Sequence, residues 1–238
     1  MELLGCFWLL GGGRYLDGLG RFNASVALNC NVIDHSLCSK LSELEAIADS
    51  ICRGHRSAAL LDKCFGRPEE VCEKLSRFRN IQIVAVGTSI FIVNALRLRS
   101  LWPFVLQSIV FIDISSDLKY PVRCLEESSL KIKISDWVVE HILGNRSCLV
   151  KIDDEWNENL VAIAGALLEY PVVYHCTSNF SNSLSRVPLY VLKTPLFSFS
   201  VPLSIWQTSP LVKLAFKHVA IQFPSATYSE VIMDRVAV

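Results

Sequence analysis

The side chains best suited to chemistry are a few carboxylates and a histidine, each at or near the end of an apolar run that predicts a buried strand. They are Asp62, Asp113, Asp153 with its neighbour Asp154, and His175. If these strands are parallel, their carboxyl ends meet at one edge of the sheet, where open α/β sheets bind ligands. Carboxylates and a histidine gathered there could support phosphoryl transfer or hydrolysis assisted by Mg²⁺ or Mn²⁺.

Two overlapping sets of candidates follow from this arrangement. The catalytic candidates are Asp62, Asp113 and His175, and the metal-ligand candidates are Asp62, Asp113 and Asp153. The alternative is structural, because aspartate after a strand is a common turn or helix-capping residue, and Asp153 and Asp154 directly precede a helical pattern. The sequence contains no recognised cofactor-binding signature, so no cofactor is identified outside the metal hypothesis.

Cysteine and histidine pairs are a second kind of candidate, for nucleophilic catalysis or zinc binding. Cys176 follows His175, and Cys38 lies three residues after His35. Neighbouring residues of an extended strand point to opposite faces, so His175 and Cys176 are not expected to pair with each other. A zinc site built from Cys30, His35 and Cys38 would lack a fourth ligand at a typical separation. Most of the cysteines are therefore interpreted as buried thiols.

The sequence offers little support for a serine hydrolase or a phosphate-binding loop. There is no G-x-S-x-G motif, and Gly87-Thr88-Ser89 between two strand-like runs fits a hairpin turn. The glycines of residues 11–20 match neither the G-x-G-x-x-G nor the G-x-x-x-x-G-K-[ST] spacing.

Composition favours an ordered, globular chain that does not bind nucleic acid. Hydrophobic residues make up 51% of the 238, which is ample for a core, and 23 basic residues balance 23 acidic ones. A protein that neutralises phosphates usually has a basic excess, which this chain lacks. The nine cysteines, an odd number without a C-x-x-C pair, favour a reducing cytoplasmic compartment, with the nucleus as an alternative. Three N-x-S sequons, at Asn23, Asn145 and Asn179, are short enough to arise by chance.

No segment has the length and composition expected of a membrane span or a cleavable leader. Residues 1–13 are apolar, but they lack a basic region before the apolar run and a small-residue cleavage site after it. Residues 101–114 and 161–176 are more hydrophobic, but charged residues or proline interrupt both. We expect residues 1–35 to be a poorly ordered or peripheral segment and residues 36–238 to form a single α/β domain without membrane contact.

Helical and strand-like patterns alternate along the chain. This predicts a three-layer α/β fold, with a mixed parallel and antiparallel sheet covered by helices on both faces. Helices are predicted over residues 37–53, from 68 onward, 96–107 with a break near Pro103, 136–143 capped by Ser135, 155–169 and 210–221. Strands are predicted over residues 58–61, 81–86, 90–93, 109–114, 148–152, 171–174, 188–192 and 196–201. Residues 115–133 show no clear pattern, and the tail after Phe223 is expected to be peripheral.

Residues 159–202 should supply the centre of the core. They contain the most apolar helix and strand of the sequence, and a helix that is apolar on two sides is covered on more than one. Burial alone would explain these elements, which argues against an active site there.

Three strings in the C-terminal block 166–202 carry a resemblance to a known family. They are ALLEYPVVY (166–174), NSLSRVPLYV (182–191) and PLFSFSVP (195–202). Together they resemble an uncharacterised eukaryotic protein family known only as a domain of unknown function, in which the AALLD run ending at Asp62 would lie in the N-terminal part. The resemblance implies an intracellular, animal-type protein and brings no catalytic residues with it.

Two functions from different classes are consistent with these patterns. The first is an intracellular α/β protein that acts without catalysis, through contacts with other proteins, and Trp102, Trp137 and Trp206 are potential parts of a partner surface. The second is a metal-dependent hydrolase or phosphoryl-transfer enzyme that uses the strand-end aspartates. Convergence of the three catalytic candidates within about 5 Å would favour the enzyme. Side chains that cap helices or lie on separate edges would favour the protein-binding role.

Overall fold

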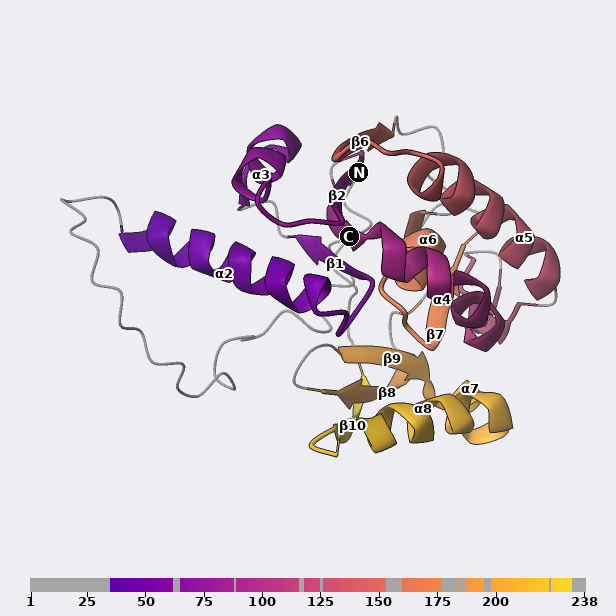
Figure 1. Cartoon of the computed structure of the whole chain (residues 1–238). Helices are drawn as coiled ribbons and strands as arrows, with labels where there is room; N and C mark the ends of the chain where they lie inside the picture. Colours follow the sequence, from indigo (N-terminus) through magenta and orange to yellow (C-terminus); the bar gives the residue numbers. More distant parts are fainter. Residues whose placement is uncertain are drawn as a thin grey trace.

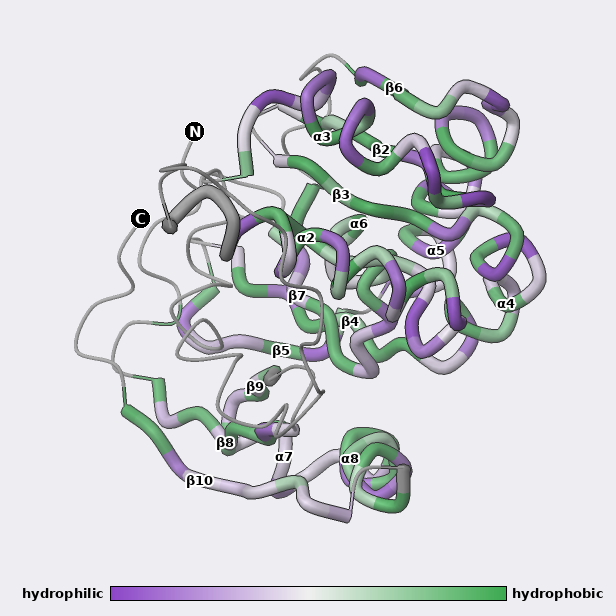
Figure 2. Tube along the Cα trace, turned by 60° about the vertical axis from the view of Figure 1, so that its left-hand side comes forward, coloured by the Kyte–Doolittle hydropathy of each residue, from purple (hydrophilic) through white to green (hydrophobic). Residues whose placement is uncertain are grey.

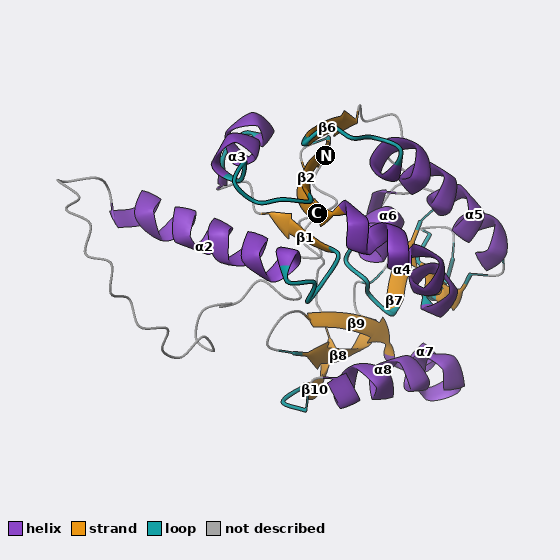
Figure 3. Cartoon of the chain, in the orientation of Figure 1, coloured by secondary structure: helices purple, strands orange, loops and turns teal. Residues whose placement is uncertain are grey.

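The computed structural model describes residues 35–61, 65–87, 89–115, 118–124, 126–152, 160–176, 184, 187–194, 198–222 and 224–232. Their strands form three hydrogen-bonded sheets with helices packed around them (Figures 1 and 3). Both parallel and antiparallel pairs occur, which confirms the predicted mixed α/β class. None of the described helices has the length and apolar character needed to cross a bilayer.

The first sheet has four strands. Its order is β1 (Ala58–Leu61), β3 (Ser89–Asn94), β2 (Ile81–Val86) and β6 (Leu149–Ile152). β2 and β3 form the predicted antiparallel hairpin, and β6 joins β2 in parallel. One face of the sheet packs on α2 (His35–Cys52) and α3 (Pro68–Lys74), through a buried cluster that includes Leu44, Val71 and Ile83.

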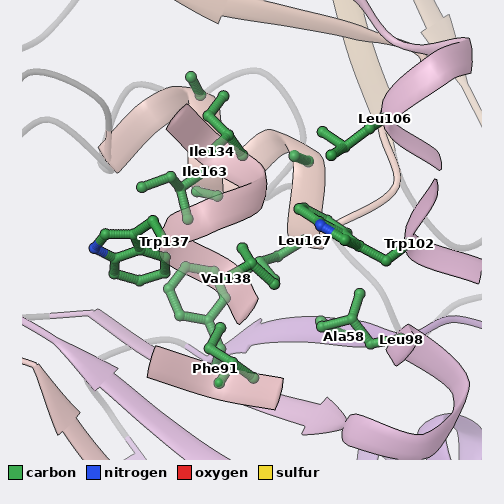
Figure 4. Packing of buried hydrophobic residues seen from close by; sticks show 14 of the residues in the cluster. Ala58, Phe91, Leu98, Trp102, Leu106, Ile134, Trp137, Val138, Ile163 and Leu167 are labelled. Atoms are coloured by element: carbon green, nitrogen blue, oxygen red, sulfur yellow. The ribbon is translucent and has the colours of Figure 1, made fainter. Parts of the chain in front are cut away.

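A layer of helices covers the other face of the first sheet and separates it from the second sheet. The layer contains α4 (Ala95–Ser108), α5 (Glu127–Val138), the π-helix η2 (Val139–Leu143) and α6 (Leu160–Leu167). Their buried side chains pack with Val84, Phe91 and Val93 of the first sheet and with Phe111 and Val173 of the second. Figure 4 shows side chains of α4, α5 and α6 meeting above Phe91. The first sheet therefore has the predicted helix–sheet–helix layering, but the described strands form three sheets and not the one sheet predicted.

The second and third sheets pack against each other. The second has the order β5 (Val122–Arg123), β4 (Val110–Asp113) and β7 (Val172–His175), and the third has β10 (Thr227–Ile232), β8 (Pro188–Lys193) and β9 (Ser198–Pro202). β4 and β7 are parallel, whereas every pair in the third sheet is antiparallel. The Tyr174 hydroxyl donates to the carbonyl oxygen of Ser200 at 3.0 Å and so links β7 to β9. The short helix α7 (Leu203–Thr208) and α8 (Pro210–Gln222) pack on the third sheet.

α6 lies at the centre of the core, as the sequence predicts. Every residue from Val161 to Leu167 is buried. Val161 packs with the second and third sheets, while Ala162 and its neighbours pack in the helix layer. A Cβ at Gly165 would lie 2.8 Å from Cγ1 of Val173, so the glycine permits α6 to approach β7 closely.

The break predicted near Pro103 is wrong, because α4 runs without interruption through this residue. Proline removes one backbone hydrogen bond from a helix. Pro103 and Arg99, whose carbonyl loses its partner, are both exposed. The opposite side of the helix buries Leu98, Trp102 and Leu106, and this packing holds the helix together across the proline.

The helix predicted to begin at Asp136 begins at Glu127, nine residues earlier. Leu130, Ile134 and Trp137 form its buried face at helical spacing. Polar residues between them hide this stripe in the sequence. The cap predicted at Ser135 is therefore wrong, and the residue lies inside α5.

The tail after Phe223 contributes a strand that sequence analysis misses. β10 pairs with β8 over six residues. Its sequence, TYSEVI, lacks the alternation of apolar and polar residues that marks a half-buried strand, and all six of its side chains are exposed.

The prediction of a tryptophan surface is wrong for two of its three members. Trp102 and Trp137 are buried in the helix layer. Trp206 is half-buried and stacks on Tyr190, with 4.5 Å between ring centroids.

Candidate functional site

Asp113 and His175 end the two parallel strands of the second sheet and lie side by side. They are paired in the register of β4 and β7. Side chains alternate along a strand, and Phe111 and Val173, two residues earlier, face the helix layer. Asp113 and His175 therefore project from the same face of the sheet, at its carboxyl edge. The structure brings these two of the predicted candidates together.

The Asp113 carboxylate is engaged in a local turn. Its Oδ1 accepts hydrogen bonds from the backbone N–H of Ser115 at 2.9 Å and from the Ser115 hydroxyl at 2.5 Å. This is the geometry by which aspartate closes a turn after a strand. His175 is 8% exposed, so little of its imidazole is open to solvent. The pair thus matches the structural alternative as well as the catalytic hypothesis.

The remaining carboxylate candidates, Asp62, Asp153 and Asp154, lie outside the described residues, but the strands before them are described. β1 and β6 are the outermost strands of the first sheet, whereas Asp113 and His175 end strands of the second. Three interstrand spacings of about 4.8 Å separate the ends of β1 and β6 by roughly 14 Å. Among the residues that the structure describes, no group of three or more His, Cys, Asp or Glu could hold a metal ion.

His175 and Cys176, the cysteine and histidine pair that the structure describes, lie on opposite faces of the second sheet. Cys176 packs with Tyr174 on the face that meets the third sheet, opposite the face of His175. This agrees with the expectation that His175 and Cys176 do not pair. Cys30 lies outside the described residues, and for His35 and Cys38 only the backbone at the start of α2 is described.

Cys124 lies near Asp113 and is a poor nucleophile. Its thiol is half-buried, and burial is the main cause that raises its pKa. The negative charges of Asp113, Glu127 and Glu126 raise the pKa further, while a backbone hydrogen bond at Glu126 lowers it. A raised pKa leaves little thiolate at neutral pH, so Cys124 does not supply the activated sulfur that nucleophilic catalysis needs.

A polar network that sequence analysis misses joins the end of α6 to the start of β1. Glu169 has a φ of 55°, in the left-handed region where glycine is usual. Its Oε1 accepts the backbone N–H of Ser57 at 2.7 Å and lies 3.9 Å from Nε of Arg97. Arg56 donates to the Leu168 carbonyl oxygen. These contacts satisfy a helix terminus, and we interpret the network as structural.

Asn94 extends this network to α2 and adds a second contact to α4. Its Oδ1 accepts the N–H of Arg97 at 3.0 Å, which caps α4, and its Nδ2 donates to the Ile51 carbonyl at the end of α2, at 3.1 Å. A sequence signal for the network exists, because a glutamate follows the apolar helix where glycine or asparagine is usual.

The layer formed by α8 and the edge strand β10 presents apolar side chains to solvent. Leu211, Leu214 and Ile221 of α8 are 48%, 63% and 69% exposed. The opposite face of α8 buries Val212 and Phe216 against the third sheet. In Figures 1 and 2 this layer lies at the end of the molecule opposite α3 and β6. We call the exposed side chains Leu211, Leu214 and Ile221 the α8 outer face.

β10 adds to this layer at the edge of the third sheet. Tyr228 and Ile232, four residues apart, project from the same side of the strand, and both are exposed. Tyr228 stacks on Tyr190, whose ring also contacts Phe216 of α8, so this is the side on which α8 lies.

The chain matches the family described as Domain of unknown function (DUF4504) over residues 29–214. This range covers most of the chain, and the protein belongs to this family. The match confirms the resemblance to a domain of unknown function and extends it from the block 166–202 to the elements from α2 to the start of α8. No solved structure matches the chain.

Proposed function

We propose that this member of the DUF4504 family is a non-catalytic protein-binding module of the cytoplasm or nucleus, and that the α8 outer face contacts its partner. One observation carries the proposal: α8 is apolar on two sides, and only one of them is used by the fold. Contiguous apolar surface that the fold leaves exposed is typical of protein contacts.

The spacing on the α8 outer face suits a helical partner. Leu211, Leu214 and Ile221 occur at intervals of three and seven residues, which places them in one line along the helix. His218, which is also exposed, fills the remaining position of this line. A stripe of this kind packs against the apolar stripe of a second amphipathic helix.

The charge on α8 indicates the chemistry of that partner. The helix sequence PLVKLAFKHVAIQ has two lysines and no acidic residue. Lys213 and Lys217 are both exposed and lie beside the apolar line. Complementary charge favours encounter with an acidic amphipathic helix and disfavours a basic one.

The geometry supports this role better than metal-dependent hydrolysis. The carboxyl ends of β1 and β6 lie on the outer strands of one sheet, and Asp113 belongs to another. The Asp113 carboxylate is hydrogen-bonded to Ser115 within its own turn. A hydrolytic site would need these carboxylates to meet at one ion, which the sheet order opposes.

The test uses a synthetic amphipathic helical peptide with an acidic polar face and a second peptide with the same apolar residues and a basic polar face. We expect the acidic peptide to bind the full chain, measured by fluorescence anisotropy. The double variant L211S/L214S should weaken binding at least tenfold, because burial of each leucine contributes about 1.5–3 kcal/mol.

Phe104→Ser is the matched control, because Phe104 is 69% exposed on α4, away from α8. It should leave binding unchanged. Equal binding of both peptides, or equal loss in the two variants, would contradict the proposal. Binding to vesicles of anionic lipid without binding to the acidic peptide would identify a membrane surface instead, and a dimer that L211S/L214S dissociates would identify a second copy as the occupant.

The hydrolase alternative has its own measurement. A shift in the melting temperature on addition of Mg²⁺, Mn²⁺ or nucleotide, lost in Asp113→Asn, would favour the enzyme, since ligands that bind the folded state stabilise it.

A further inference from the structure

Two cysteines that are far apart in the sequence have adjacent thiols. Cys72 lies on α3, and Cys148 directly precedes β6. Their side chains are hydrogen-bonded to each other. Both thiols are free, Cys148 is exposed and Cys72 is half-buried. A small oxidant can therefore reach the pair from solvent.

The surrounding structure holds both positions in place. The Ile83 N–H donates to the Cys148 carbonyl oxygen at 2.8 Å, which fixes the backbone of Cys148 beside β2. Cys72 packs in the apolar cluster between α3 and the first sheet, and so does Leu149. On the solvent side, Lys151 pairs with Glu69, one turn of α3 before Cys72. α3 and the start of β6 are thus held side by side by contacts that do not involve sulfur.

We propose that Cys72 and Cys148 are a reversible oxidation site, at which a disulfide bond ties α3 to β6. The site is independent of the proposed partner surface, which lies at the other end of the molecule.

The reaction is thiol–disulfide exchange with a low-molecular-weight disulfide such as glutathione disulfide. The Cys148 thiolate attacks one sulfur of the oxidant and expels one glutathione thiolate, which leaves a mixed disulfide on Cys148. The Cys72 thiolate then attacks the Cys148 sulfur and expels the second glutathione thiolate. The protein loses two thiol protons and two electrons, and the oxidant becomes two glutathione molecules.

The environment of the two thiols sets the order of these steps. Burial, and then the hydrogen bond and charge interaction with Cys148, raise the pKa of Cys72 to about 11. Cys148 is the more accessible sulfur and is the first to react, and Cys72 resolves the adduct. The second step should accelerate as the pH rises toward the pKa of Cys72, because more thiolate is then present.

The consequence for stability follows from the length of chain between the two cysteines. The bond would close a loop that contains β2, β3, α4, β4 and α5. Cross-links that close long loops remove conformational entropy from the unfolded chain. For a chain of this size we expect the melting temperature to rise by roughly 5–10 °C.

The experiment incubates the reduced full chain with mixtures of reduced and oxidised glutathione, quenches with acid, alkylates the remaining thiols and maps the peptides by mass spectrometry. We expect a peptide cross-linked through Cys72 and Cys148 that dithiothreitol reverses. In Cys72→Ser the adduct should stop at glutathione on Cys148. Cys124→Ser, which changes a half-buried cysteine elsewhere in the fold, should retain the cross-link.

Three outcomes would overturn the proposal: a lasting glutathione adduct on Cys148 in the unaltered chain, a cross-link between other cysteines, or no cross-link in excess oxidant. Cys148→Ser is a second variant that tests the proposal even if Cys72→Ser fails to fold, because it changes an exposed side chain. It should fold and show neither the cross-link nor the rise in melting temperature on oxidation.

Discussion

The first and third sheets are covered in different ways. The first sheet has α2 and α3 on one face and the α4–α6 layer on the other. The third sheet has α7 and α8 on one face, and it ends at β10, whose six side chains are all exposed. Most apolar residues of the first sheet are buried and stabilise the fold, whereas those of the α8 outer face are exposed and add little to stability. This is why we assign the partner surface to the C-terminal layer.

The largest expected effect is the loss of stability when a fully buried phenylalanine is replaced, and each of the two regions contains one. Phe111 of β4 belongs to the buried cluster that packs on the first sheet through the helix layer, and Phe216 lies between α8 and the third sheet. Replacement of either by alanine should lower the free energy of unfolding by about 3–5 kcal/mol, measured by denaturant titration.

Hydrogen exchange distinguishes the two variants. Phe111→Ala should accelerate exchange in the helix layer and in the second sheet, whereas Phe216→Ala should accelerate it in α8 and β10 first. Equal acceleration in β2 and β3 by Phe216→Ala would show that the two regions are one cooperative unit and would break the comparison.

Close packing of α6 on β7 gives the next largest effect. Gly165→Ala places a methyl group against Val173 and should cost about 1–3 kcal/mol of stability through overpacking. Val173→Ala should relieve this cost when the two changes are combined, so that the double variant loses less than the sum of the single ones. Simple additivity would contradict the close approach.

The pH dependence of stability reports burial at the junction of the second and third sheets. Burial raises the pKa of Tyr174 above its ordinary value near 10. The folded state then keeps a proton that the unfolded state loses, so stability is retained below about pH 10 and falls as the pH rises above it.

Tyr174→Phe should reduce this alkaline decline, measured by denaturant titration between neutral pH and pH 11, while Tyr170 and Tyr190, whose pKa values burial also raises, keep part of it. It should also cost stability at neutral pH, because the hydrogen bonds of the hydroxyl to Ser200 are lost. Tyr120→Phe, at an exposed tyrosine, is the control and should keep the decline of the unaltered chain.

The smallest effect is expected at the α8 outer face. Leu214→Ser should change the free energy of unfolding by no more than about 0.5 kcal/mol, because the side chain is already exposed. A loss of several kcal/mol would mean that the outer face supports the fold, and the contrast between the two regions would disappear.

Local patterns in the sequence predict much of the element order but little of the pairing between distant strands. The hairpin of β2 and β3 follows from two strand-like runs separated by Gly87-Thr88-Ser89, and the central helix α6 follows from its apolar composition. The parallel pair of β4 and β7 brings together strands that are far apart in the sequence, and no local period encodes that contact.

The candidate site shows the same limit. The position of Asp113 and His175 at strand ends is visible in the sequence, and so is the possibility that Asp113 forms a turn. Their adjacency, and the placement of β1 and β6 on the outer strands of another sheet, depend on sheet order. The sequence predicts an amphipathic helix over residues 210–221 with Lys213 and Lys217 on one face, but it does not show which apolar side chains of that helix the fold buries.

The parallel pairing of distant strands also constrains how the chain folds during synthesis. α2, β1, β2 and β3 can associate once residue 94 has left the ribosome, because their contacts are local in sequence. β6 completes the first sheet only after residue 152, and β4 waits for β7 until residue 175. Until β7 has been synthesised, the apolar strand β4 lacks its parallel partner. An unpaired apolar strand in a nascent chain is prone to aggregation, so correct folding of this part depends on residues synthesised late.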